Sequence, residues 1–106
     1  MEKKKAAKPK VTKAPSSTAP YVVGNAYLFR TVTHHQLGRV VAVGPQEISI
    51  TEAGWLADSG RFHDFLKSGT PNEFEPAEKP TDVIFVGRAA IVDVWPWHKD
   101  LPSSQK

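Results

Sequence analysis

The chain has 106 residues, enough for one domain with a single modest hydrophobic core. It has no cysteine, which excludes a disulfide framework, a thiolate metal site and a cysteine nucleophile. No apolar run approaches the roughly 20 residues of a membrane span, and the opening MEKKK is not followed by the apolar stretch of a signal peptide. We therefore expect neither a membrane contact nor secretion through a signal peptide.

Residues 1–20 form a basic arm, in which six lysines and one glutamate give a formal charge of +5. The remaining residues hold eight basic and ten acidic groups, so the body carries −2. The arm has too few large apolar side chains to offset its ordering entropy, and we expect it to be disordered in isolation. We predict that it fastens the protein to a partner, either an acidic protein surface or nucleic-acid phosphates, and a purely solvating tail is the alternative. The lysines are Lys3, Lys4, Lys5, Lys8, Lys10 and Lys13.

The body begins with a predicted strand at residues 26–33, where aromatic and β-branched side chains predominate. One face of this strand carries Leu28, Arg30 and Val32. The opposite face, which we expect to be buried, carries Tyr27, Phe29 and Thr31. Residues 39–43 and 48–51 are the next predicted strands, joined by a tight turn, so the three segments predict an antiparallel meander.

A helical insertion is predicted over residues 54–68, because the sequence there leaves the strand pattern. Ser59 is a suitable N-cap, and Gly69 is placed to end the helix. The apolar face of the helix is formed by Phe62, Phe65 and Leu66. We expect this face to pack on the strands.

Residues 70–82 predict an acidic, proline-stiffened loop rather than a regular element. Residues 83–86 and 89–95 then supply two strands, or one long bent strand. The order of elements favours a mainly β fold, a small five-stranded SH3-like or Sm-like barrel over residues 21–100, followed by a C-terminal tail at 101–106. An open sheet with one helix is the alternative.

Three stretches of the body resemble the two motifs of a known family. Residues 37–43 (LGRVVAV) and 48–53 (ISITEA) resemble the first motif of Sm-like proteins, and residues 86–92 (VGRAAIV) resemble the second. This resemblance implies a small barrel that binds oligonucleotides. The aspartate-and-asparagine turn with which that family binds RNA is replaced here by GPQE at 44–47, and the arginine–glycine pair is reversed at 87–88.

A second resemblance concerns the segments 29–33 (FRTVT), 38–40 (GRV) and 57–62 (ADSGRF). They are similar to segments of small uncharacterised proteins of tailed bacteriophages. The resemblance implies a viral setting, in which such a domain decorates or stabilises a capsid. It places the protein in the virion or in the host cytoplasm.

Catalytic and metal-binding patterns are not evident in the sequence. His34 and His35 are adjacent, so on a strand they point to opposite faces and cannot chelate one ion. No serine lies in a nucleophile-elbow motif, and the glycines are too scattered to form a phosphate-binding loop. We therefore expect no catalytic residue, no metal and no cofactor, and we predict that the protein is not an enzyme.

Two surfaces are candidate binding sites. Trp95 and Trp97 share one face of an extended segment, whereas Val92 and Val94 take the other face and are the expected core residues. We expect both tryptophans to stand outside the core, at an interface. A possible nucleic-acid surface comprises Arg30, Arg39, Arg61 and Arg88, with Tyr27, Trp55 and Phe62 for stacking.

These features together favour a non-enzymatic structural or assembly protein. Its partner would be a larger protein assembly, such as a capsid or scaffold protein, or a second copy of this chain. The alternative is an Sm-like oligonucleotide-binding protein, with the basic arm contacting nucleic acid.

Overall fold

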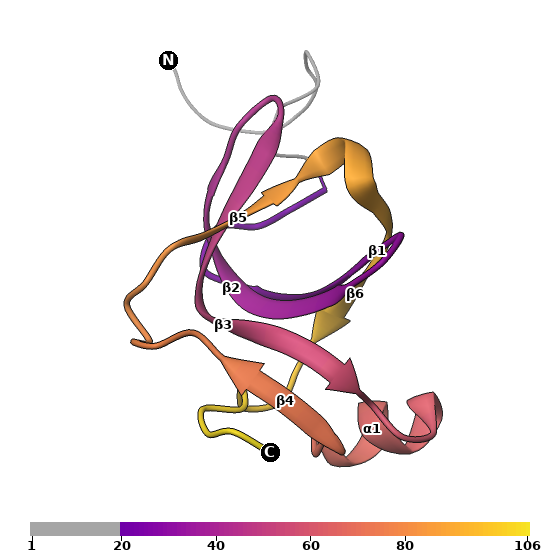
Figure 1. Ribbon diagram of the computed structural model, residues 1–106. Helices are drawn as coiled ribbons and strands as arrows, with labels where there is room; N and C mark the ends of the chain where they lie inside the picture. The colour runs from indigo at the N-terminus through magenta and orange to yellow at the C-terminus, as the bar shows by residue number, and fades with distance from the viewer. Residues whose placement is uncertain (1–19) are drawn as a thin grey trace.

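The computed structural model describes residues 20–106 (Figure 1). The predicted basic arm, with its six lysines, lies outside the described residues except for Pro20. The elements, in chain order, are β1 (Ala26–Thr31), β2 (His35–Val43), β3 (Glu47–Asp58), α1 (Phe62–Ser68), β4 (Glu73–Pro76), β5 (Ile84–Gly87), the 3-10 helix η1 (Arg88–Ala90) and β6 (Ile91–Trp97).

All six strands belong to one antiparallel sheet, so the mainly β class is confirmed. The strand order is β4-β3-β2-β1-β6, and β5 pairs with the first part of β3. The sheet has six strands where five were predicted for the barrel, because the expected acidic loop contains β4. There, Phe74 is fully buried between the exposed Glu73 and Glu75, an alternation that suits a half-buried strand.

The sheet is strongly curved, as Figure 1 shows. The register shifts twice along the β2–β3 pair, and Glu52 in the middle of β3 adopts a positive φ of 50°. At Gly38 a Cβ would lie 2.7 Å from Ile50 Cδ1, so the absence of a side chain lets the two strands approach closely at the bend. Within residues 20–106, no strand pairing joins β5 to β6.

Both faces of the sheet are buried, and this corrects the expectation of a single core. Leu28 and Phe29 are neighbours on β1 and point to opposite faces, yet both have 0% exposed surface. The helix-side cluster consists of Ala26, Leu28, Leu37, Leu56, Phe65, Phe74 and Trp97. The inner cluster, on the other face, consists of Phe29, Val40, Ile48, Ile50, Ala53 and Val86.

The helix is shorter than predicted. Residues 54–58 continue β3, so the insertion proper begins after Asp58. Ser59 is not the N-cap: its hydroxyl donates to the Gly60 carbonyl, and α1 begins three residues later without a side-chain cap. Gly69 does end the helix as predicted, with φ of 74° and its N–H donating to the Phe65 carbonyl.

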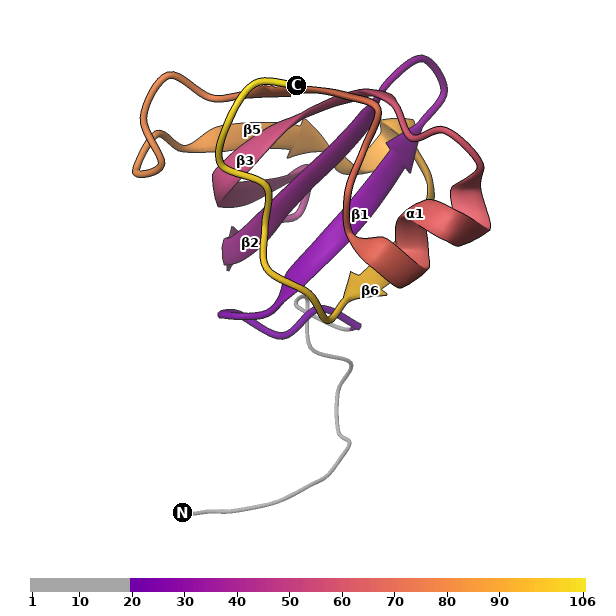
Figure 2. The same cartoon turned by 90° about the horizontal axis from the view of Figure 1, so that it is seen from below.

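The C-terminal segment returns along the molecule to β4, as Figure 2 shows in yellow. Lys106 and Phe74 exchange two backbone hydrogen bonds of 2.9 Å, which cover the outer edge of β4. Leu101 packs against the helix-side cluster on the way. The predicted tail at 101–106 is therefore part of the packed structure.

Candidate functional site

Trp95 and Trp97 share the helix-side face of β6, but only one of them stands outside the core. Trp97 is 6% exposed, lies 5.0 Å from the Phe65 ring between centroids, and donates its indole N–H to the Asp100 carbonyl at 3.2 Å. The prediction that Trp97 stands outside the core is therefore wrong, because α1 covers that end of the face. Trp95 remains 37% exposed.

The expected core role of Val92 is also wrong. The pairing of β1 with β6 shifts register at Arg30 and Thr31, so Val92 has no partner in the pairing and is 64% exposed. Val94, beyond the shift, packs against the inner cluster as predicted.

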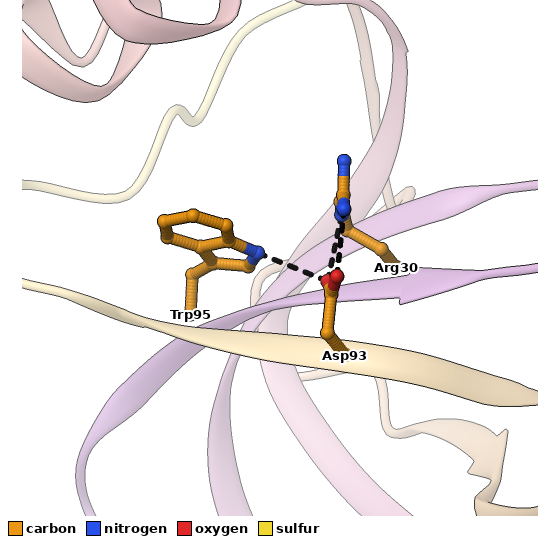
Figure 3. Close-up of polar contacts among 3 residues, drawn as sticks. All are labelled: Arg30, Asp93 and Trp95. Carbon is orange, nitrogen blue, oxygen red and sulfur yellow. Dashed lines mark hydrogen bonds and ion pairs between the residues drawn. The ribbon is translucent and has the colours of Figure 1, made fainter.

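Four side chains from three elements meet around Trp95, and we call this group the aromatic corner: Arg30, Phe62, Asp93 and Trp95. Arg30 and Asp93 are register partners on β1 and β6, and the guanidinium donates two hydrogen bonds of 2.6 Å to the two carboxylate oxygens. The Trp95 indole N–H donates to Asp93 Oδ1 at 2.9 Å (Figure 3). Asp93 therefore holds both the Arg30 guanidinium and the Trp95 indole in place.

Phe62 of α1 completes the aromatic corner from the side of the helix. Its ring meets the Trp95 ring edge-on, with the centroids 5.2 Å apart and the planes at 82°. The Arg30 guanidinium carbon lies 5.3 Å from the Phe62 ring centroid and 5.9 Å from that of Trp95. The tryptophan is thus held by one hydrogen bond, one ring contact and one cation.

The electrostatics of the aromatic corner follow from the bidentate ion pair. The hydrogen bonds from Arg30 hold the pKa of Asp93 below its ordinary value, against the opposing effect of partial burial, and the same bonds raise the pKa of Arg30. Both groups are charged at neutral pH and cancel each other. Their side chains are 33% and 38% exposed, so the pair orients Trp95 more than it stabilises the fold.

A hollow adjoins the aromatic corner and shares Trp95 with it. It has a volume of about 240 Å³ and is lined by Leu66, Trp95, Pro96, Trp97, His98 and Lys99. Most of this lining is apolar or aliphatic. Trp95 lines this hollow, so the exposed part of the indole adjoins it.

The four arginines predicted to contact nucleic acid have different neighbours in the structure. Arg30 belongs to the aromatic corner, and Arg39 pairs with Glu52 at 2.8 Å near the other end of β1. Arg88 donates to the Gly44 carbonyl and lies over the Tyr21 ring, while Arg61 is exposed at the start of α1. Arg30 and Arg39 are each paired with a carboxylate, so the charges of two of the four candidates are already neutralised.

The two adjacent histidines lie apart, as their position in the chain predicts. His34 accepts or donates a hydrogen bond with the Thr33 hydroxyl and lies 5.5 Å from the Trp55 ring, whereas His35 is close enough to Asp93 to lower its pKa. Across residues 20–106, no three histidine, aspartate or glutamate side chains are grouped so that they could hold a metal ion.

Sequence reasoning missed Asp93, and it named Phe62 beside Arg30 as a stacking residue without predicting its contact with Trp95. Asp93 carries a usable signal, since it is a lone charge between apolar residues of a predicted strand and could be matched to the lone charge of Arg30. Phe62 carries none, because its contact with Trp95 depends on where α1 docks.

Comparison with other proteins gives no relative: no protein-family model, no curated protein and no solved structure matches this chain. In the part of the chain that the structure describes, no helix is both long and apolar enough to cross a membrane.

Proposed function

We propose that the protein is a non-enzymatic assembly module that binds a partner protein through the aromatic corner. The observation that carries this proposal is that Trp95 is 37% exposed and yet held in place by Asp93 and Phe62. Tryptophan and arginine are the side chains most enriched among residues that dominate binding energy. An anchor that is already oriented loses little side-chain entropy on binding.

The hollow beside Trp95 supports the same use. Its volume of about 240 Å³ suits a side chain of the partner, which would then contact Trp95 and the stem of Lys99. The neutralised Arg30–Asp93 pair contacts Trp95 without lining the hollow, and it would supply part of the polar rim that surrounds a typical binding centre.

The proposal includes a finer fold and a biological setting. We assign β5, β3, β2, β1 and β6 to a small bent barrel of SH3-like or Sm-like type, in which α1 and β4 are an insertion after β3. The partner would be a capsid or scaffold protein, or a second copy of the chain, with the six lysines of the arm as a second attachment. The bacteriophage setting rests on the sequence resemblance of segments 29–33, 38–40 and 57–62.

The test compares Trp95→Ala with Trp55→Ala, a matched control because Trp55 is 43% exposed on another part of the sheet. Self-association of the purified chain is measured by sedimentation equilibrium. For a different partner, a protein captured from a lysate of the cells in which the chain is made is identified, purified and titrated with each variant. Loss of a binding centre costs about 2 kcal/mol or more, so we expect the dissociation constant to rise at least about 30-fold for Trp95→Ala alone. Equal losses for both variants, or no Trp95-dependent association, would contradict the proposal.

The alternative function is oligonucleotide binding, favoured by the six lysines within the first 13 residues. Lysines that contact phosphates release counterions, so the logarithm of affinity would fall linearly with the logarithm of salt concentration. The full chain is titrated with a single-stranded oligonucleotide at several salt concentrations. This function requires a steep slope that is reduced when the lysines are replaced, and unchanged binding of the Trp95→Ala variant.

A further inference from the structure

A hollow lies where the chain enters β1 and leaves β6, two stretches that run beside each other at one end of the molecule in Figure 2. It has a volume of about 290 Å³. Its lining is rich in hydrogen-bond donors and, within residues 20–106, includes no acidic residue. The lining includes Asn25, Ala26, Arg39, Trp97, His98 and Lys99.

The register of three strands explains the shape of the hollow. Ala26 of β1 is opposite Arg39 of β2 on one side and opposite Trp97 of β6 on the other. Residues that are directly opposite in an antiparallel pair share a face, so these three side chains form one row on the helix-side face. The methyl group of Ala26 is much shorter than its two neighbours, which leaves room between them. One wall of the hollow is therefore Arg39, and the other is the chain from Trp97 to Lys99.

Arg39 is held in one orientation, while part of its guanidinium stays available. Its Nε donates to Glu52 Oε2 at 2.8 Å, and its Nη1 donates to the Gly24 carbonyl at 2.9 Å. Nη2 bonds none of residues 20–106, and the side chain is 39% exposed. Glu52 does not line the hollow. A guanidinium fixed by a carboxylate and a carbonyl is already oriented, so binding an anion costs it little side-chain entropy.

The rest of the lining supplies donors and positive charge. The side chains of Asn25, His98 and Lys99 form no hydrogen bond or ion pair with residues 20–106, and all three residues are exposed. Since Glu52 balances the charge of Arg39, the charge left at the hollow is that of Lys99, joined by His98 in its protonated form. The body as a whole carries −2, so this end of it is locally positive. Such a site suits an anion.

We propose that this hollow binds a phosphate dianion, either the inorganic ion or the terminal group of a phosphate monoester. A terminal phosphate has three free oxygens, so it can accept hydrogen bonds from Arg39, from Lys99 and from a third donor of the lining at the same time. Arginine offers phosphate a planar fork of donors, and lysine adds a compact charge. A phosphodiester has fewer free oxygens and a single charge, and it binds less well. No residue of the aromatic corner lines this hollow, so the proposal does not depend on the function proposed above.

The test is a titration of the isotope-enriched full chain, followed by NMR shifts of single amides, which separates the hollow from the lysines of the arm. Inorganic phosphate, phenyl phosphate and dimethyl phosphate are compared at constant ionic strength and at pH about 8, where a monoester, with a second pKa of about 6, is a dianion. We expect saturable shifts at Ala26, His98 and Lys99. Val32, in the β1–β2 turn, should not respond.

The three probes also identify the source of the phosphate. The diester should bind at least about 10-fold more weakly than phenyl phosphate, the loss expected for one charge-assisted hydrogen bond. Tighter binding of phenyl phosphate than of inorganic phosphate assigns the hollow to an esterified ligand, and the reverse order assigns it to the free ion.

Two variants with the same change of charge separate the hollow from general attraction. Lys99→Gln removes a charge from the lining and should raise the dissociation constant of phenyl phosphate at least about 10-fold. Lys79→Gln removes a charge from an exposed position outside the lining and should leave the constant unchanged. Arg39→Lys keeps the charge but not the fork and should weaken binding as well, with the dispersion of the other amide signals showing that the chain remains folded. Equal effects of Lys99→Gln and Lys79→Gln, equal affinity for the diester, or shifts that do not saturate would overturn the proposal.

Discussion

Truncating the two tryptophans of β6 one at a time tests the central feature of the fold, the placement of α1 on one face of the sheet. Trp97→Ala removes an indole that is 6% exposed and stacked on Phe65, whereas Trp95→Ala removes one that is 37% exposed at the rim. The two positions share a strand, a face and a residue type. Any difference between them therefore reports how far the helix covers that face.

The expected magnitudes follow from burial. Truncating a fully buried tryptophan costs about 3–5 kcal/mol, and we expect Trp97→Ala to lie within this range. A tryptophan presents up to about 250 Å², so the difference between 37% and 6% exposure corresponds to roughly 80 Å² of apolar surface. At about 25 cal/mol per Å² this is ~2 kcal/mol, by which Trp95→Ala should be the milder change.

The assay is urea denaturation of the full chain, followed by far-ultraviolet circular dichroism because fluorescence changes with each tryptophan removed. With a slope of about 1–2 kcal/mol per molar urea, the midpoints of the two variants should differ by about 1–2 M. Equal midpoints, or a lower midpoint for Trp95→Ala, would refute the assignment of Trp97 to the core and of Trp95 to the rim.

Phe65→Ala should cost about 3–5 kcal/mol because the ring is 1% exposed under α1, and an unchanged urea midpoint would place the helix elsewhere. Gly54→Ala should lower the free energy of unfolding by about 1–3 kcal/mol, since its Cβ would overlap a ring carbon of Phe74. Gly87→Ala, whose Cβ would have no atom within 4 Å, should leave the free energy of unfolding nearly unchanged in the same measurement. The lowered pKa of Asp93 means that its ion pair stabilises the fold fully above the ordinary aspartate pKa of about 3.9 and less as pH falls through the lower native value. The difference in unfolding free energy between wild type and Asp93→Asn should therefore vanish at acid pH, and a constant difference from pH 7 to pH 3 would contradict this origin.

Much of the secondary structure could be predicted because it depends on local preference. Runs of β-branched and aromatic residues identified β1, β2, β5 and β6, and Gly69 identified the end of α1 through its left-handed conformation. β4 was missed because the predicted loop around it holds three prolines and three glutamates, a composition typical of loops. These residues are Pro71, Pro76, Pro80, Glu73, Glu75 and Glu78. Only the pairing of the segment with β3 on one side and with Lys106 on the other makes it a strand.

The arrangement of the faces could not be predicted from alternation alone. Alternation correctly placed Trp95 and Trp97 on one face of β6, and Leu28 and Phe29 on opposite faces of β1, but it does not say which face is buried. A small domain with one core buries one face of its sheet, and that assumption assigned Trp97 to the surface. In the structure both faces are buried, one by curvature of the sheet onto itself and the other by α1.

The exposed position of Trp95 follows from the shortness of α1. A helix of seven residues is about 10 Å long, whereas the seven residues of β6 extend over about 23 Å. Side chains on one face of a strand recur every 7 Å or so, which means that such a helix covers one or two of them. It covers Trp97 through Phe65 and meets Trp95 only edge-on through Phe62. The next position on that face is occupied by Asp93, whose hydrogen bonds hold the half-covered tryptophan in place, and this is why an aromatic anchor can be both exposed and ordered.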